Sequence, residues 1–196
     1  MPRTGPLNLI TDVAGVQVGS AMDTRAATGV TVVTLEPAAV ASVSILGGAP
    51  GTRDTAFLEP DMTVEATHAI VLAGGSAFGL DAAGGVQAVL AERGVGLAVG
   101  AARVPLVPQA IVFDLNNGGD KRWGRTPPYF ALGMQAAEAA AQTLHARDDS
   151  WYTGANIDGK PRQLMPYAGH FGEYAVLCDE IAADGYRGFA IRAPRG

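Results

Sequence analysis

The most constraining feature of the sequence is an apolar run that passes through a glycine turn into a helical repeat. Residues 68–73 are almost continuously apolar, as expected of a buried strand. The turn Gly74-Gly75-Ser76-Ala77-Phe78-Gly79 follows it directly. Apolar residues then recur three or four positions apart, on one face of a helix, at Leu80, Ala83, Val86 and Leu90. This order predicts a strand, a tight turn and a helix, with Arg93-Gly94 ending the helix.

The rest of the chain contributes further short elements. β-branched or alternating patterns predict strands over 8–18 (with a turn at Gly15), 29–35, 41–46, 96–99 and 111–115. Helical spacing predicts helices over 128–142 and 171–183. Residues 47–61, 151–156 and 159–162 are predicted as loops, and 104–108 as an extended linker because its prolines oppose helix. This mixture predicts an α/β fold.

Composition excludes several classes of partner and location. The formal net charge of −5 opposes a nucleic-acid partner, since phosphate binding needs a basic surface. No segment reaches the roughly 18 apolar residues of a membrane helix, so no membrane partner is expected. Cys178 is the only cysteine, which fits a reducing compartment. We expect a cytoplasmic protein.

The glycine turn is the best local candidate for a binding site. Unpaired N–H groups at a helix start favour an anion or a developing oxyanion, which points to Gly74, Gly75 and Ser76. The alternative is a tight turn in which glycine serves backbone geometry alone. Phe78 stands where a Gly-x-Ser-x-Gly nucleophile elbow needs its second glycine, so that hydrolase type is not supported.

Other candidate sites are weaker. Arg53 lies in the 47–61 loop and could bind a carboxylate, although a solvated pair with Asp54 is the commoner arrangement. His68, His145 and His170 are far apart in sequence, so structural roles are expected and no metal site is predicted. No Gly-x-Gly-x-x-Gly turn joins a strand to a helix, and no cofactor is predicted.

Five motifs resemble one family of enzymes. They occur, in order, at 8–19, 28–33, 47–55, 73–81 and 104–115. Over about 7–142 the chain resembles the L-aminopeptidase/D-esterase family, which also contains β-aminopeptidases and nylon-oligomer hydrolases. The resemblance implies an incomplete αββα sandwich of the α+β type. It also implies a precursor that cuts itself, so that Ser or Thr becomes the first residue of a second subunit.

The resemblance also shows which groups the sequence lacks. A freed α-amine beside its own hydroxyl can help to activate that hydroxyl as a nucleophile. The chain has no Asn-Ser or Asn-Thr pair, and its Gly-led pairs, Gly19-Ser20, Gly51-Thr52 and Gly75-Ser76, fall inside the matched motifs. Some relatives have Tyr in the glycine turn, where its hydroxyl contributes to the oxyanion site, and Phe78 lacks that hydroxyl. No catalytic residue is therefore assigned.

The C-terminal part of the chain has a different character. Ten of the 13 aromatic residues lie from Trp123 onward. Residues of about 146–193 resemble the extreme C-terminus of flavin-dependent Baeyer-Villiger monooxygenases, whose FAD and NADP domains have no counterpart here. We therefore expect an aminopeptidase-like part over 1–142 and a monooxygenase-like tail over 143–196 that is not an independent domain.

These observations predict a truncated and fused relative of an amide hydrolase that is inactive alone. One alternative is an active amide or ester hydrolase completed by a partner chain, and another is a non-catalytic fragment or assembly partner. The expected ligand is at most a small peptide or amide. An open sheet edge and an uncovered apolar face would favour self-association or aggregation.

Overall fold

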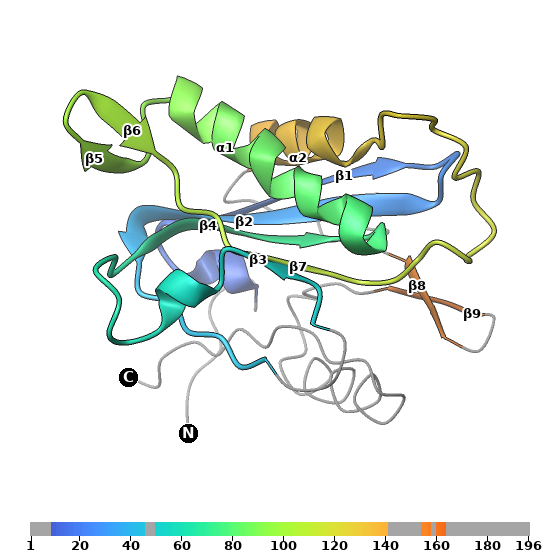
Figure 1. The fold of residues 1–196 in the computed structure, drawn as a ribbon, viewed down its shortest axis with the longest axis horizontal. Helices are drawn as coiled ribbons and strands as arrows, with labels where there is room; N and C mark the ends of the chain where they lie inside the picture. Colours follow the sequence, from blue (N-terminus) through green and yellow to red (C-terminus); the bar gives the residue numbers. More distant parts are fainter. Residues whose placement is uncertain (1–8, 46–49, 141–153, 158–159, 164–196) are drawn as a thin grey trace.

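A mixed five-stranded sheet forms the centre of the molecule. The computed structural model describes residues 9–45, 50–140, 154–157 and 160–163. The strand order is β1-β2-β4-β7-β3. β4 and β7 are parallel, whereas the other neighbouring pairs are antiparallel (Figure 1). A mixed sheet with helices confirms the predicted α+β class.

The first two strands form a long hairpin. β1 (Val16–Asp23) pairs with β2 (Thr28–Ala39) from Val16↔Leu35 to Asp23↔Thr28. The strand predicted over 29–35 is confirmed, but it runs past Pro37, where the β2–β4 ladder is irregular. The strand predicted over 8–18 begins later than expected, because η1 (Ile10–Asp12) precedes β1; residue 8 itself lies outside the described residues.

The strand predicted over 41–46 is not formed over 41–45, and residue 46 lies outside the described residues. The sequence there is suitable for a strand, yet Val40 is 84% exposed and Ile45 is 44% exposed. A strand needs a neighbour to accept its backbone hydrogen bonds, and no described strand pairs with this segment.

The predicted strand, turn and helix are confirmed. β4 (Thr67–Ala73) leads through the glycine turn into the 3₁₀ helix η3 (Ser76–Asp81) and then α1 (Ala82–Glu92). Three of the four predicted apolar positions of the helical face, Ala83, Val86 and Leu90, are buried. The helix ends at Arg93-Gly94, as expected, with Gly94 at a φ of 72°.

A hairpin and a short parallel strand follow the helix. β5 (Leu97–Val99) confirms a predicted strand and pairs with β6 (Ala102–Val104). The two strands project beyond the end of α1 (Figure 1). The strand predicted over 111–115 is misplaced, because β7 spans Gln109–Ile111. Pairing begins directly after Pro108, and the chain leaves the sheet early enough to bury Asp114.

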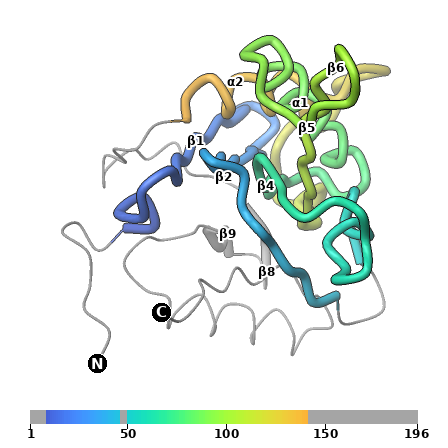
Figure 2. The backbone as a smooth tube through the Cα atoms, turned by 90° about the vertical axis from the view of Figure 1, so that its left-hand side faces the viewer, coloured from blue at the N-terminus to red at the C-terminus, as the bar shows by residue number. Residues whose placement is uncertain are grey.

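Two helices cover one face of the sheet (Figure 2). α2 (Tyr129–Glu138) is shorter than the predicted 128–142 and packs against α1, β1 and β2. Sequence spacing places Phe130 on its apolar face, but the helix is rotated so that Tyr129 is buried and Phe130 is 47% exposed. The core between helices and sheet comprises Val30, Val32, Ala69, Val71, Ala73, Ala82, Ala83, Val86, Val89, Leu90, Val107, Tyr129, Leu132, Ala136 and Ala137.

The opposite face of the sheet is also apolar. Val18, Val33 and Ile70 are cross-strand neighbours on that face. All three side chains are buried, so the expectation of an uncovered apolar face is not met at these positions.

Small elements complete the description. β3 (Thr52–Arg53) and η2 (Ala56–Leu58) interrupt the predicted 47–61 loop. β8 (Gly154–Ile157) and β9 (Lys160–Gln163) pair where loops were predicted. The Asp158-Gly159 dipeptide between them is a hairpin signal in the sequence, and the loop prediction did not use it.

The helix predicted over 171–183 lies outside the described residues. Within the described part, no helix has the length and hydropathy to cross a membrane.

Candidate functional site

The candidate site is the glycine turn at the end of β4, which has an unusual backbone conformation. Gly75 has a φ of 87° and Ser76 a φ of 53°, both in the left-handed region. A side chain at Gly75 would collide with the ring of Tyr129, so the turn requires glycine there for two reasons. The next residues form η3, and Phe78 on it is 50% exposed.

The N–H groups that the sequence suggested for an oxyanion are engaged within the protein. Gly74 donates to the Gly29 carbonyl at 2.9 Å, and Ser76 donates to the Val112 carbonyl at 2.9 Å. Gly75 donates to Oδ1 of Asp114 at 2.7 Å. These bonds fix the turn against both neighbouring strands. An oxyanion role for the three N–H groups would require breaking them, so that role stays a prediction.

Asp114 is the buried group that organises the turn. It is 1% exposed, and its second oxygen accepts a hydrogen bond from Thr28 Oγ1 at 2.5 Å. Thr28 Oγ1 lies 3.1 Å from the Tyr129 hydroxyl, and because the Thr28 hydrogen already points to Asp114, Tyr129 donates. Residues from β2, the post-β7 segment and α2 therefore meet in one network.

The electrostatics of this network are governed by burial. Burial raises the pKa of Asp114, and the hydrogen bonds from Thr28 and Gly75 and the charge of Lys121 act against that rise. Burial likewise raises the pKa of Tyr129. A buried carboxylate is costly unless it is hydrogen-bonded and paired, and Asp114 has both kinds of partner.

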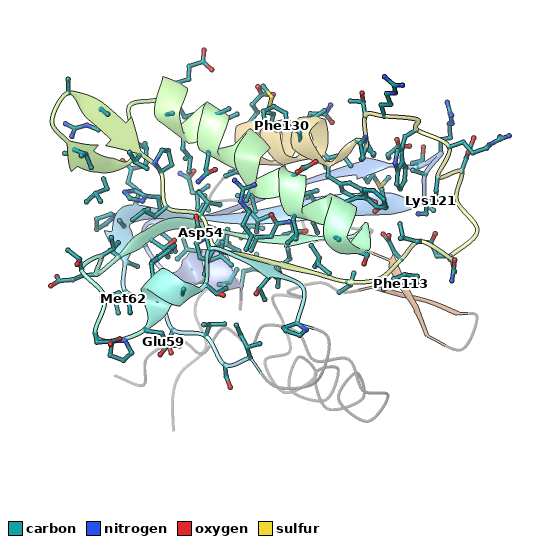
Figure 3. All side chains as sticks on the ribbon, in the orientation of Figure 1. Asp54, Glu59, Met62, Phe113, Lys121 and Phe130 are labelled. Atoms are coloured by element: carbon teal, nitrogen blue, oxygen red, sulfur yellow. The ribbon has the colours of Figure 1, made fainter. Side chains whose placement is uncertain are left out.

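Lys121 supplies the nearest positive charge. Its Nζ lies 3.9 Å from Oδ1 of Asp114 and donates to the carbonyls of Ala26 and Ala27. Burial lowers the pKa of Lys121, while the Asp114 and Asp23 carboxylates oppose that shift. Figure 3 shows Lys121 at the end of the molecule where β1 turns into β2.

The loop that carries Lys121 is clamped onto the β1–β2 turn. The N–H of Asp120 donates to the Arg25 carbonyl at 2.9 Å, and its carboxylate pairs with Arg25 and Arg122. These arginines hold the pKa of Asp120 below its usual range. Asn117 Nδ2 donates to the Ala27 carbonyl at 2.5 Å. The clamp places Lys121 beside the glycine turn.

Three aromatic rings form a row beside the glycine turn. Tyr129 is fully buried against Gly75. Trp123 packs edge to face on Tyr129, with ring centroids 5.8 Å apart. Phe78 packs edge to face on Trp123 at 5.9 Å and an interplanar angle of 71°. The row therefore runs from the core to the surface beside Ser76.

Arg53, which the sequence suggested as a possible carboxylate-binding residue, lies close to the site, but its side chain bonds to other groups of the protein. Its guanidinium donates to the Leu80 carbonyl at 2.9 Å and to Gln87 Oε1 at 3.1 Å. Within the described ranges, the ion pairs involve Asp114 and Asp120, and the Arg53–Asp54 pair is not formed. Arg53 thus fastens β3 to η3 and α1.

Sequence reasoning identified the turn but not the residues that hold it. Asp114, Lys121 and Trp123 all follow β7, in a polar, glycine-rich stretch at the carboxyl end of a strand. Such loops commonly carry functional groups in α/β sheets, and this signal could have found them. Buried Gln109, which accepts from the Ala83 N–H and donates to the Gly79 carbonyl, carried no such signal.

Histidines and other metal ligands are dispersed. Nδ1 of His68 accepts the N–H of Leu106 at 3.2 Å, a structural role. His145 and His170 lie outside the described residues. Among the residues that the structure describes, no three His, Cys, Asp or Glu side chains are grouped closely enough to hold a metal ion.

Comparison with known proteins identifies one family over most of the chain. Residues 8–145 match the profile described as peptidase family S58. An uncharacterized aminopeptidase of Mycobacterium tuberculosis (strain ATCC 25618 / H37Rv) is 46% identical over 150 residues, which cover 70% of this chain and 43% of that protein. A 6-aminohexanoate-oligomer endohydrolase of Kocuria sp. (strain KY2) is 36% identical over 137 residues, 70% of this chain and 35% of that protein.

A relative of another class matches over a shorter stretch. An acetone monooxygenase (methyl acetate-forming) of Gordonia sp. (strain TY-5) is 44% identical over 54 residues, 28% of this chain and 10% of that protein. The chain thus spans less than half the length of each of these three relatives.

Proposed function

Because the chain belongs to peptidase family S58, we propose that it supplies the amide-binding half of an aminopeptidase-type hydrolase and does not hydrolyse amides by itself. The proposal depends on two observations: the N–H groups of the glycine turn are all hydrogen-bonded, and each of the three Gly-led pairs falls within a strand, at the start of a strand or in the turn itself. The relatives named as an aminopeptidase and an oligomer endohydrolase support an amide substrate.

The three Gly-led pairs support the absence of self-processing. Ser20 lies inside β1 and pairs with Thr31, and Thr52 begins β3. Ser76 is held in the turn through its N–H bond to Val112. Cutting before any of these residues would break a sheet ladder or the site itself. An N-terminal Ser or Thr nucleophile would therefore have to come from another chain or from further residues.

We also propose that the part over 1–142 carries the amide site and that the tail over 143–196 adds no oxygenase activity. The monooxygenase match covers only 10% of that relative, and the glycine fingerprint of a dinucleotide site is absent from the sequence. The chemistry of such enzymes belongs to the flavin, which the tail alone has no domain to bind.

Two measurements on the purified chain test this proposal. Mass spectrometry should show one species at the full 20.1 kDa. Aminoacyl anilides and 6-aminohexanoate oligomers should be hydrolysed no faster with the chain than in buffer alone. Two held fragments, the second beginning with Ser or Thr, would overturn the proposal. Measurable turnover by the wild-type chain would also overturn it if one of three variants, Ser20→Ala, Thr52→Ala or Ser76→Ala, abolished that turnover. The inactive variant would then identify the nucleophile.

A further inference from the structure

The loop between β7 and α2 contains the dipeptide Asn117-Gly118, whose side-chain amide and backbone nitrogen are close enough in the chain to react with each other. This loop runs past the end of the β1–β2 hairpin (Figure 1). Gly118 has no Cβ to shield its nitrogen from the preceding side chain. Of the four asparagines in the sequence, Asn117 alone precedes glycine. The dipeptide is therefore a candidate for an intramolecular reaction.

The Gly118 nitrogen is the nucleophile of such a reaction, and it is accessible. Its N–H makes no hydrogen bond to another described residue. Gly118 is exposed, and a Cβ built on it would have no atom within 4 Å. Its φ of 91° lies in a region that glycine enters without strain, so the backbone can adjust there. Hydroxide from solvent can therefore reach and deprotonate this N–H.

The side-chain amide of Asn117 is held in a polarising environment. Its Oδ1 accepts the N–H of Gly119 at 3.4 Å, which folds the side chain back along the chain over Gly118. Its Nδ2 donates to the Ala27 carbonyl at 2.5 Å, and the Lys121 ammonium donates to that same oxygen at 3.5 Å. A hydrogen-bond donor and a nearby positive charge both stabilise the negative charge that develops on Oδ1 during attack.

We propose that Asn117 is a site of spontaneous deamidation in the folded protein. The Gly118 nitrogen loses its proton to hydroxide and attacks Cγ of Asn117. The Cγ–Nδ2 bond breaks, Nδ2 leaves as ammonia after taking a proton from water, and a cyclic succinimide remains. Water then opens the ring at either of its carbonyls, which gives aspartate or isoaspartate. The net reaction is hydrolysis of one amide by one water molecule, with no change of oxidation state.

The product alters the contact that holds the loop to the hairpin. A carboxylate at position 117 has no N–H to donate, and it faces the carbonyl oxygen of Ala27. Its negative charge also competes with Asp114 for the Lys121 ammonium. Deamidation therefore weakens the clamp that places Lys121 beside the glycine turn. This reaction requires neither a substrate nor a nucleophile from another chain, so it is independent of the proposed function.

Peptide mass spectrometry of the full chain, aged in slightly alkaline buffer, tests the site. Asn117 should convert to a mixture of aspartate and isoaspartate, with release of ammonia. Asn116 is the internal control, because it is exposed in the same loop and precedes a residue that has a side chain. Product at Asn117 should exceed product at Asn116 at least about tenfold. Comparable conversion at both residues, or none at Asn117, would overturn the proposal.

The unfolded chain shows whether the fold leaves the amide reactive. In guanidinium chloride, conversion of Asn117 should be no more than about tenfold faster than in the folded chain, because the native loop leaves Gly118 exposed. A larger ratio would mean that native contacts protect the amide, and it would refute deamidation in the folded protein.

A pair of charge variants tests the effect on the clamp. Asn117→Asp has the charge of the product and should lower the urea midpoint of unfolding. Asn116→Asp adds the same charge to the same loop without removing the bond to Ala27, so its midpoint should equal that of the wild type. Equal midpoints for the two variants would contradict the proposed weakening of the clamp.

Discussion

At the scale of single residues, buried polar groups explain why the site has its shape. Asp114 connects Gly75 on the turn with Thr28 on β2, and Tyr129 extends the link to α2. Each hydrogen bond to a buried charge contributes about 1.5–3 kcal/mol, which is more than a bond between neutral groups. The conformation of the turn thus depends on a carboxylate 39 residues away in sequence.

His68 makes stability depend on pH in a defined direction. Burial lowers its pKa from the ordinary 6.5. A depressed folded-state pKa means that the unfolded chain takes up its proton first as the pH falls. The stability associated with neutral His68 is therefore present above pH 6.5 and is lost as the pH falls toward the folded-state value.

The expected result is a free energy of unfolding that decreases between about pH 7.5 and about pH 5, with a smaller decrease in His68→Asn. Urea denaturation at both pH values measures it. An identical pH dependence in wild type and His68→Asn would refute the assignment.

At the scale of elements, the two helices approach each other through glycines. A Cβ at Gly85 on α1 would collide with the Phe130 carbonyl oxygen, and one at Gly133 on α2 would collide with the Ala82 carbonyl oxygen. The small residues are therefore what allow α1 and α2 to lie side by side over the sheet.

Neighbouring glycines in α1 provide a direct test. Gly85→Ala should destabilise the protein by about 1–3 kcal/mol, because the new methyl group overlaps backbone atoms that cannot move alone. Gly84→Ala is the control, since its Cβ would lie 3.4 Å from the Phe130 ring and 3.5 Å from Arg53 Nη1. It should be neutral or stabilising by about 0.5–1 kcal/mol from its helical preference. Equal effects in urea denaturation would contradict the close helix contact.

At the scale of the whole molecule, the sheet ends in a long strand. β1 is the outermost strand of the described sheet and has eight residues, whereas the other edge, β3, has two. A long edge with unpaired backbone groups can pair with another chain. The predicted self-association is thus better attributed to β1 than to an uncovered sheet face, because the side chains of Val18, Val33 and Ile70 are buried.

Size-exclusion chromatography measures this association. The purified chain should elute, at least in part, ahead of a 20.1 kDa monomer. Gln17→Lys places a charge on the β1 edge and should reduce the associated fraction, whereas Gln135→Lys on the exposed surface of α2 should not. A monodisperse wild-type monomer would contradict the prediction.

The sequence by itself determined the elements whose patterns involve only a few neighbouring residues. The apolar run of β4, the glycine turn and the spacing along α1 specified that unit, because helical periodicity and glycine conformations act over a few residues. The motifs of the aminopeptidase family also lie in the primary sequence, and they predicted the family over residues that its profile matches.

Only the tertiary structure decided which residues form the site. Asp114, Lys121 and Trp123 meet the turn because β7 lies parallel to β4 and the loop after β7 returns over the β1–β2 hairpin. The same packing occupies the turn N–H groups and gives Arg53 protein partners. Contacts between residues distant in sequence depend on how elements pair and cross, and no local pattern encodes that arrangement.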